Sequence, residues 1–556
     1  MRFEDKPWLK YYDPWVLPEL EVPPTTYMDL FEKTFKEFPD KPSLHFLGTA
    51  LTFAQLDDCS ARFASYLKEI GCGSKDVIGI CLPNFPQWLI AYLGALRAGC
   101  VTTGVSPLLR PKEMQFQLSD SGAKAIVIMD VFYENTFLKI ADDLRGVEHV
   151  IVTAATDYFP EAIKPATPYA APAPRKQALA TFMNVMEQSL PVKGYARLKP
   201  DDPCVIQYTG GTTGTPKGAI VSHQALIDNT RRFENWLGEV RGRSVSISAF
   251  PLFHMAGLWS ISHYLQMGFT QVLIPNPRDT KYICQAFETY RPNEFGFVPS
   301  LYQMLLDTPE FRKLDFSNVD HCISGAAPMP LETLQALENL IGKGKVVEIY
   351  GLTESAPLIT MNPKNRPKPG SVGVPIQNVM VKLVDLETET TEVPIGEPGH
   401  LIYRAPNMIT GYHERPEDTE ATFRLFQGER WLFTGDVARM DEEGYLYIVD
   451  RTKDMIIVSG YKVFSKEVEE TLYQHPSVQY CAVVGVPNPE RPGSDQVKAL
   501  IQLTDAYKNR DPQKLVEEII KFCRENMSPY KVPKIIEFTE AIPLTPIGKV
   551  DKKVLR

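Results

Sequence analysis

The sequence of 556 residues is longer than a single hydrophobic core usually serves, so two or more domains are expected. Its 44% hydrophobic and 23% charged residues are typical of a globular protein and argue against a disordered or low-complexity chain. The formal charge of -9, from 59 basic and 68 acidic residues, provides no positive field for nucleic acid, and we expect no nucleic-acid partner.

Nine cysteines are dispersed along the chain with no Cys-x-x-Cys pair, which indicates reduced thiols in a cytoplasmic protein. The first twenty residues mix charged and aromatic side chains and lack the apolar core of a signal peptide. The most apolar early stretch, residues 88–109, contains Arg97 and three glycines, and it falls short of the roughly 18 uninterrupted apolar residues of a membrane helix. We expect no transmembrane segment, and a peripheral membrane contact stays open.

The first part of the chain alternates two kinds of pattern. Amphipathic stretches predict helices at residues 27–38 and 53–70. Short β-branched runs predict strands at residues 77–81, 125–129, 150–153, 204–207 and 272–274. This alternation predicts an α/β fold. Proline-rich residues 164–176 are expected to form a surface loop, because proline sustains neither a helix nor a sheet ladder.

The pattern changes in the last third of the chain. Closely spaced strand and turn signals at residues 371–385 and 400–404 predict a small antiparallel β-subdomain. From about residue 453 a final unit is expected, with helices at residues 465–474 and 512–526 and strands at residues 480–485 and 497–502. This unit is small enough to move as one body.

A loop rich in glycine and threonine follows the strand predicted at residues 204–207. Residues 208–218 read YTGGTTGTPKG. The glycines let backbone amides approach an anion, the threonines add hydroxyl donors and Lys217 adds positive charge, a combination that suits a polyphosphate. The loop is not a P-loop, because Pro216 precedes the lysine and Gly218 follows it.

This loop resembles the signature of the adenylate-forming superfamily, which includes acyl-CoA synthetases, luciferases and the adenylation domains of peptide synthetases. Its Thr-Gly-Gly-Thr-Thr-Gly form is most similar to bacterial long-chain fatty acid-CoA ligases. The resemblance implies that the loop binds the phosphates of ATP. The residues concerned are Thr209, Gly210, Gly211, Thr212, Thr213, Gly214 and Lys217.

Two further segments resemble parts of the family's nucleotide site. In the first, Tyr350-Gly351-Leu352-Thr353-Glu354, the resemblance places the aromatic ring against adenine and makes Glu354 the ligand of Mg²⁺, with Thr353 beside it. In the second, Gly325-Ala326-Ala327, small residues leave room along adenine and the acyl tunnel. Taken alone, each is a common turn; their order along the chain supports the resemblance.

The ribose and the hinge are assigned in the same way. Asp436, in a Thr-Gly-Asp triplet, resembles the aspartate that accepts both ribose hydroxyls, work that suits an ionised carboxylate. Arg451 resembles an arginine that contacts the nucleotide, and Lys453 stands at the hinge. We therefore divide the chain into an N-terminal AMP- and acyl-binding domain over residues 1–449, a hinge over residues 450–453 and a mobile domain over residues 454–556.

Three more residues complete the predicted site. Lys549, in a Thr-Pro-Ile-Gly-Lys frame, resembles the lysine that bridges the acyl carboxylate and the α-phosphate. Gly460 resembles a glycine beside the pantetheine tunnel of coenzyme A. His254 resembles the residue that gates the acyl channel, although a histidine in an apolar run is equally expected to pack in the core.

The resemblance implies a complete fold and activity. The expected fold is α/β, with two α/β sheets and a small β-barrel-like subdomain in the N-terminal part and a small, mobile α+β C-terminal domain. The expected reaction uses ATP and Mg²⁺ to convert a medium- or long-chain fatty acid into an acyl-adenylate, whose acyl group then passes to the thiol of coenzyme A. We expect a monomer or homodimer. An enzyme for another carboxylic acid, such as an aryl acid, and a catalytically inactive acyl-nucleotide sensor stay open as alternatives.

Overall fold

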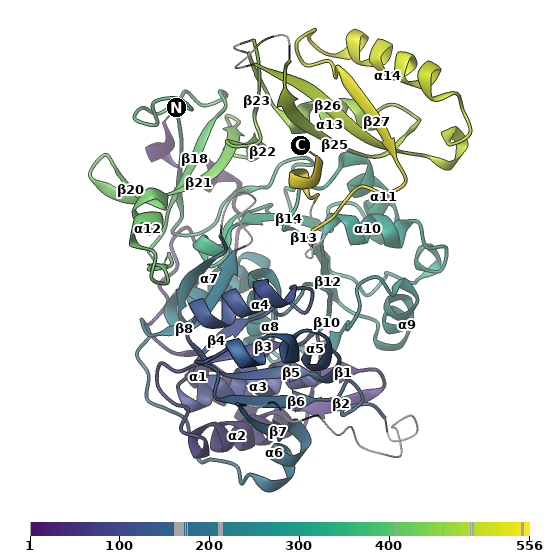
Figure 1. Ribbon diagram of the computed structural model, residues 1–556. Coiled ribbons are helices and arrows are strands. Elements are labelled where there is room, and N and C mark those ends of the chain that lie inside the picture. The colour runs from purple at the N-terminus through teal and green to yellow at the C-terminus, as the bar shows by residue number, and fades with distance from the viewer. Residues whose placement is uncertain are drawn as a thin grey trace.

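The computed structural model describes residues 2–160, 172, 174, 176–209, 215–406, 408–459, 461–489, 491, 494–545 and 550–555 (Figure 1). Most of the predicted loop at residues 164–176 therefore lies outside the described residues. The predicted strand at residues 77–81 and the predicted helix at residues 512–526 are confirmed with the same bounds. Helices α1 (Tyr27–Glu37) and α2 (Phe53–Glu69) each end one residue before the predicted end.

Two large sheets form the base of the molecule. Within the described ranges, the first has eight strands in the order β19-β9-β8-β4-β3-β5-β6-β7. Their bounds are Gly411–Tyr412, Lys217–Ser222, Pro203–Thr209, Val101–Gly104, Val77–Cys81, Ala123–Met129, His149–Thr153 and Ala178–Thr181. Helices α4 (Pro111–Asp120), α5 (Asp130–Asn135) and α6 (Phe182–Gln188) connect its strands.

The second large sheet contains nine strands of the described chain, in the order β16-β15-β14-β13-β12-β10-β11-β1-β2. Their bounds are Val374–Pro375, Leu358–Met361, Val346–Gly351, His321–Ser324, Glu294–Phe297, Val245–Ser248, Thr270–Leu273, Pro42–Phe46 and Thr49–Thr52. Its helices are α7 (His223–Leu237), α8 (Met255–Met267), α9 (Thr280–Tyr290), α10 (Pro299–Leu306) and α11 (Leu331–Ile341).

The core runs between these layers through α3 (Pro86–Ala98). All thirteen residues of this helix are buried, as expected for a helix that is apolar on every side. The helix begins with Pro86 and is capped by Gly99. The φ of 89° at Gly99 would be unfavourable for a residue with a side chain. Most of the apolar stretch at residues 88–109 is thus buried in α3 and β4, whereas Leu108, after β4, is exposed. No helix among the described residues is both long enough and apolar enough to cross a membrane.

A third sheet is built from the antiparallel strands that the turn-rich pattern predicts. In the described part of the chain its order is β17-β18-β21-β20, with β22 paired to β21. The bounds are Met380–Val384, Gly399–Arg404, Glu429–Met440, Phe423–Phe426 and Leu446–Arg451. Helix α12 (Pro416–Thr422) precedes β20. The predicted antiparallel subdomain is confirmed.

The last unit has a core of its own. Strands β25 (Val478–Pro487), β26 (Asp495–Leu503) and β27 (Ile535–Thr539) form a sheet that α13 (Ser465–Tyr473) and α14 (Pro512–Asn526) cover, next to a hairpin of β23 (Ile456–Val458) and β24 (Tyr461–Val463). In Figure 1 this unit, in yellow and yellow-green, lies over α10 and α11. The predicted fold class is therefore confirmed.

Candidate active site

The carboxyl end of β14 supplies two of the predicted site residues. Tyr350 lies at the end of this strand, and Glu354 follows in a short 3-10 turn over Thr353–Ser355. Between them, residue 351 has to be a glycine. A Cβ there would lie 1.8 Å from the carbonyl oxygen of Pro357, closer than any side chain allows. The turn is held by the N–H of Leu352, which donates to the same carbonyl at 2.9 Å and to Ser355 Oγ.

Asp436 joins Tyr350 to Arg451. The hydroxyl of Tyr350 donates to Asp436 Oδ2 at 2.7 Å, and Arg451 Nε lies 3.5 Å from Asp436 Oδ1. Asp436 and Arg451 face each other across β21 and β22. Burial and the adjacent Asp436 carboxylate raise the pKa of Tyr350 well above its usual value, so the tyrosine stays a neutral donor. The three side chains form one polar cluster beside β14.

A second cluster connects Glu354 to Lys217. The hydroxyl of Tyr412 donates to Glu354 Oε1 at 2.6 Å, while Lys217 Nζ lies 5.4 Å from the centre of the Tyr412 ring. Lys217 also forms an ion pair with Asp418. Burial, followed by the charge of Glu354, raises the pKa of Tyr412, so its hydroxyl keeps its proton. The Tyr412 side chain thus contacts both the carboxylate of Glu354 and the ammonium group of Lys217.

Tyr412 and Asp418 were not predicted from the sequence. Tyr412 belongs to the two-residue strand β19, which pairs with β9 and places this residue opposite Ala219. Asp418 lies in the first turn of α12. Neither residue stands in a motif, and they reach the site only because the chain returns to the edge of the first sheet after two hundred residues. A pairing of that range leaves no local signal in the sequence.

The family to which the chain belongs is shown by its sequence. The profile of the AMP-binding enzyme family matches residues 31–413, and the profile of the AMP-binding enzyme C-terminal domain matches residues 467–549. The chain is an AMP-binding enzyme. The fold and both clusters are therefore those of a member of this family.

Curated relatives cover almost the whole chain. A long-chain-fatty-acid–CoA ligase from Bacillus subtilis (strain 168) is 34% identical over 99% of this AMP-binding enzyme and 97% of its own length. A ligase of the same name from Escherichia coli O157:H7 is 35% identical over 99% and 98%. A mitochondrial medium-chain acyl-CoA ligase from Mus musculus is 30% identical over 96% and 87%.

Solved structures share the same architecture. An anthranilate CoA ligase in complex with anthranoyl-AMP superimposes with a TM-score of 0.85 at 26% identity, over 96% of this chain and 97% of the other. ATP-bound MatB from Rhodopseudomonas palustris gives a TM-score of 0.82 at 26% identity, over 96% and 98%. The apo form of the same MatB gives 0.72. The arrangement of the whole chain is therefore more similar to the ATP-bound form.

The predicted phosphate loop of this AMP-binding enzyme lies between two paired strands, β8 and β9. Thr209 at the end of β8 lies opposite Lys217 at the start of β9, and its hydroxyl donates to the Lys217 carbonyl oxygen at 3.4 Å. The predicted residues Gly210, Gly211, Thr212, Thr213 and Gly214 lie outside the described residues. Lys217 is therefore the described member of the predicted loop that lies over the Tyr412 ring, whose hydroxyl contacts Glu354.

The predicted adenine loop lies after β13, and the predicted gate residue lies at the start of α8. Gly325 follows β13, and a Cβ there would lie 2.6 Å from Ile349 Cγ1 on β14; Ala326 adopts a left-handed φ of 67°. His254 caps α8, with Nδ1 accepting from the N–H of Ala256 at 3.3 Å. The amide of Gln207 in β8 donates to the Phe253 carbonyl at 3.0 Å, which ties the His254 segment to the strand that leads into the phosphate loop.

The predicted hinge at residues 450–453 begins in the last two residues of β22, and the predicted C-terminal domain follows it. Lys453 is exposed in a turn whose N–H groups at residues 454 and 455 donate to the Arg451 carbonyl. The carboxylate of Asp450 accepts from the N–H and hydroxyl of Ser465, which starts α13. Lys552 Nζ in turn contacts Ser465 Oγ at 2.5 Å and Glu469 Oε1 at 3.0 Å. Gly460 and Lys549 lie outside the described residues.

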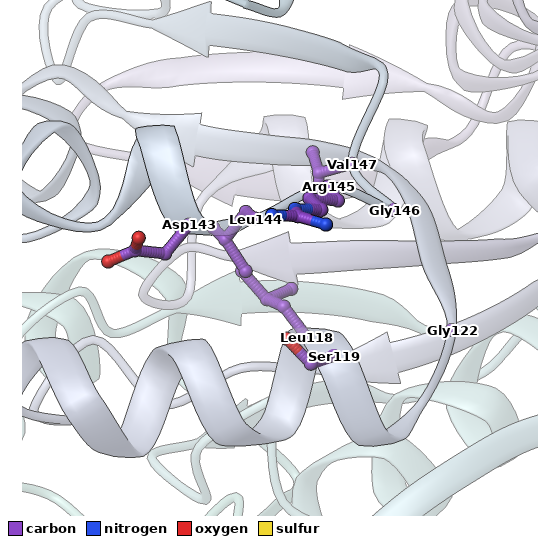
Figure 2. Close-up of a pocket in the computed structure, with 8 residues that line it drawn as sticks. All are labelled: Leu118, Ser119, Gly122, Asp143, Leu144, Arg145, Gly146 and Val147. Atoms are coloured by element: carbon purple, nitrogen blue, oxygen red, sulfur yellow. The ribbon is translucent and has the colours of Figure 1, made fainter.

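Figure 2 shows a pocket at the first sheet whose lining residues belong to neither cluster. It is lined by the end of α4 and by the segments that precede β5 and β6, from Leu118 to Gly122 and from Asp143 to Val147. The parallel strands β5 and β6 begin at this edge, whereas β8 reaches Thr209 at the opposite edge. None of the predicted site residues lines this pocket.

Proposed function

We propose that this AMP-binding enzyme is an ATP-dependent ligase that converts a fatty acid of medium or long chain into an acyl-adenylate and then into its coenzyme A thioester. Support comes from full-length relatives named long-chain-fatty-acid–CoA ligase at 34% and 35% identity. The observation that carries the proposal is the position of Tyr350 and Glu354, four residues apart at the end of β14. Tyr350 contacts Asp436, and Glu354 is connected to Lys217 through Tyr412. This arrangement suits a nucleotide with its ribose at Asp436 and its phosphates at Lys217.

The nucleotide is assigned to these groups by chemistry. Asp436, an acceptor held by Tyr350 and Arg451, receives the ribose hydroxyls. The Tyr350 ring and the Gly325, Ala326 and Ala327 loop lie along adenine. Thr209, Gly210, Gly211, Thr212, Thr213, Gly214 and Lys217 surround the phosphates. Lys217 shares its charge with Asp418 and can exchange that partner for a phosphate oxygen.

The residues present also fit Mg²⁺. Glu354 offers a hard carboxylate oxygen, and Tyr412 fixes its orientation through the other oxygen at 2.6 Å. Bound between Glu354 and the phosphates, the ion would neutralise charge on the leaving pyrophosphate. Thr353, next to Glu354 in the same turn, is assigned with it to catalysis.

Adenylation follows from this arrangement. A carboxylate oxygen of the fatty acid attacks the α-phosphorus of ATP, and the bond to the bridging oxygen of pyrophosphate breaks. Positioning and electrostatic stabilisation carry such a step, because negative charge develops on the attacking and leaving oxygens. We assign Lys549 to bridging the acyl carboxylate and the α-phosphate, where it would neutralise their negative charge. We assign His254 to gating the acyl channel.

Thioester formation requires a second arrangement. The thiol of coenzyme A attacks the acyl carbon, the bond to the AMP oxygen breaks, and AMP leaves. We assign the change between the two steps to rotation of residues 454–556 about Lys453, which removes Lys549 and brings Gly460 to the pantetheine. A substitution tests this division of labour. Lys549→Ala should abolish adenylation and preserve thioester formation from synthetic acyl-adenylate; equal loss of both half-reactions would contradict it.

The identity of the carboxylic acid substrate is tested with a panel of acids. Pyrophosphate release and acyl-CoA formation are measured with acids from acetate to oleate, together with benzoate and anthranilate. The proposal expects the largest kcat/KM with an alkyl chain of eight carbons or more. Aryl acids form the second candidate, because a structure with anthranoyl-AMP bound superimposes at a TM-score of 0.85, and a preference for benzoate or anthranilate would favour it. An inactive nucleotide sensor would release no pyrophosphate with any acid.

A further inference from the structure

Two glutamates and two histidines form a buried cluster away from the nucleotide site. The side chain of His263 has no exposed surface, and those of Glu294, His321 and Glu239 are 3%, 4% and 6% exposed. Glutamate is almost never buried to this extent without a partner of opposite charge. Two in one cluster need an explanation that the nucleotide site does not provide.

Four elements of the second sheet bring these residues together. Glu294 and His321 are the first residues of β12 and β13 and lie directly opposite each other in the parallel pair. His263 lies within α8, and Glu239 follows Gly238, whose φ of 64° ends α7. The predicted adenine loop begins at Gly325, after the opposite end of β13. The cluster is therefore at the edge of the sheet remote from the nucleotide.

The distances are those of groups that share one centre. His263 Nε2 lies 2.7 Å from Glu239 Oε2, His321 Nε2 lies 3.3 Å from Glu294 Oε2, and the same His321 nitrogen lies 3.9 Å from Glu239 Oε1. One ligand atom each from Glu239, Glu294 and His321 falls within 4.8 Å of the others. Tetrahedral Zn²⁺ with bonds of about 2.1 Å places its ligand atoms about 3.4 Å apart. His321 Nε2 and Glu294 Oε2, 3.3 Å apart, already have about that spacing.

Several polar atoms of the cluster have no hydrogen-bond partner in the described chain, and no lysine or arginine there pairs with its carboxylates. Glu239 Oε1 and Glu294 Oε1 are buried without a hydrogen-bond partner in the described chain, as are His263 Nδ1 and His321 Nδ1. No lysine or arginine of the described residues lies within 4.0 Å of either carboxylate, and nearby Arg231 pairs with Glu234 instead. A divalent cation would balance the two buried carboxylates.

We propose that Glu239, Glu294 and His321 bind a zinc ion, with His263 hydrogen-bonded to Glu239 beside them. The imidazole nitrogen of His321 favours zinc over magnesium or calcium, and a hydrogen bond such as the one from His263 orients a metal-binding carboxylate. The ion would fasten the end of α7 and, through His263, the middle of α8 to the base of the sheet that carries Gly325 and Tyr350 at its other edge. The site is independent of the proposed acyl-CoA ligase activity.

The test is made on the full-length protein, purified without an affinity tag and treated with a strong chelator. Zinc chloride is titrated calorimetrically, bound zinc is measured by elemental analysis after dialysis, and thermal unfolding is followed with and without one equivalent of zinc. We expect one zinc per chain and a rise in Tm of several degrees. The double substitution Glu239→Gln with His321→Gln should abolish both.

His149→Gln is the matched control, since this histidine lies 3.9 Å from Glu148 in the first sheet, outside the cluster. It should bind zinc like the unmodified protein. If the unmodified protein binds no zinc, or the double variant binds it equally, the proposal is wrong, and the four groups share protons instead. The measurements on the unmodified protein decide the question even if the double variant does not fold. Cobalt titration gives a second readout, because tetrahedral Co²⁺ would produce visible absorption bands that the double variant lacks.

Discussion

Removing one hydroxyl group, with Tyr412→Phe, isolates the link between Glu354 and Lys217. The substitution deletes the hydrogen bond from Tyr412 to Glu354 Oε1, which is 2.6 Å long, and keeps the ring over which Lys217 lies. A hydrogen bond to a charged group contributes about 1.5–3 kcal/mol. At 1.36 kcal/mol for each tenfold change in rate, its loss corresponds to a reduction of kcat/KM for MgATP by roughly 10- to 150-fold.

The assay measures pyrophosphate release over a range of ATP and Mg²⁺ concentrations. If Tyr412 orients a magnesium ligand, the variant should need more Mg²⁺ for half-maximal rate, and added Mg²⁺ should recover part of the activity. Tyr403→Phe is the matched control, because the Tyr403 hydroxyl is also buried but has no hydrogen-bond partner in the described chain. A Tyr412 variant with normal MgATP kinetics and only reduced thermal stability would refute the reasoning.

Three further outcomes are expected. Asp436→Asn should raise the KM for ATP at least tenfold without lowering Tm below that of a matched surface variant, since it removes the charge that Arg451 faces; an unchanged KM would separate this carboxylate from ribose. Burial raises the pKa of Glu348 to about 7 from 4.5, so the native state retains a proton that the unfolded chain loses as pH rises through this window, and stability falls there. Glu348→Gln should therefore unfold at higher temperature than the unmodified protein at pH 8, by up to about 3 kcal/mol in free energy, and show no gain at pH 4. Lys552→Met should lower adenylation more than thioester formation from acyl-adenylate, because it releases the segment after Lys549 from Ser465; equal effects on both would indicate a purely structural lysine.

The sequence predicted the site best where chemistry and local backbone demand coincide. In the Tyr350 segment, Gly351 is required by the close approach of Pro357, and the acid predicted for the site, Glu354, follows the end of the strand. Both features therefore lie within five residues of the sequence. Asp436 and Arg451 are also predictable as members of motifs, although their contact depends on the register of β21 and β22. Their roles toward a bound nucleotide stay proposals.

Residues that reach the site through tertiary structure could not be predicted. Tyr412 lies beside Glu354 because a two-residue strand joins the edge of the first sheet, and nothing around it in the chain marks a function. The Glu239 cluster likewise combines four distant segments, each carrying a single acid or histidine. Helices and strands were predicted more accurately, because hydrophobic periodicity is a local property of the sequence. The bounds of α14 and β3 were predicted as observed, and the strand predicted at residues 272–274 is Thr270–Leu273 in the structure.

The fate of the carboxylate oxygens tests the central claim most directly. The fatty acid is labelled with ¹⁸O in both carboxylate oxygens and converted with ATP and coenzyme A, and the products are analysed by mass spectrometry. Attack on the α-phosphorus followed by cleavage of the acyl–oxygen bond predicts one ¹⁸O in AMP and none in pyrophosphate. Unlabelled AMP, or label in a phosphate product other than AMP, would contradict an acyl-adenylate formed at the site of Tyr350, Asp436 and Lys217.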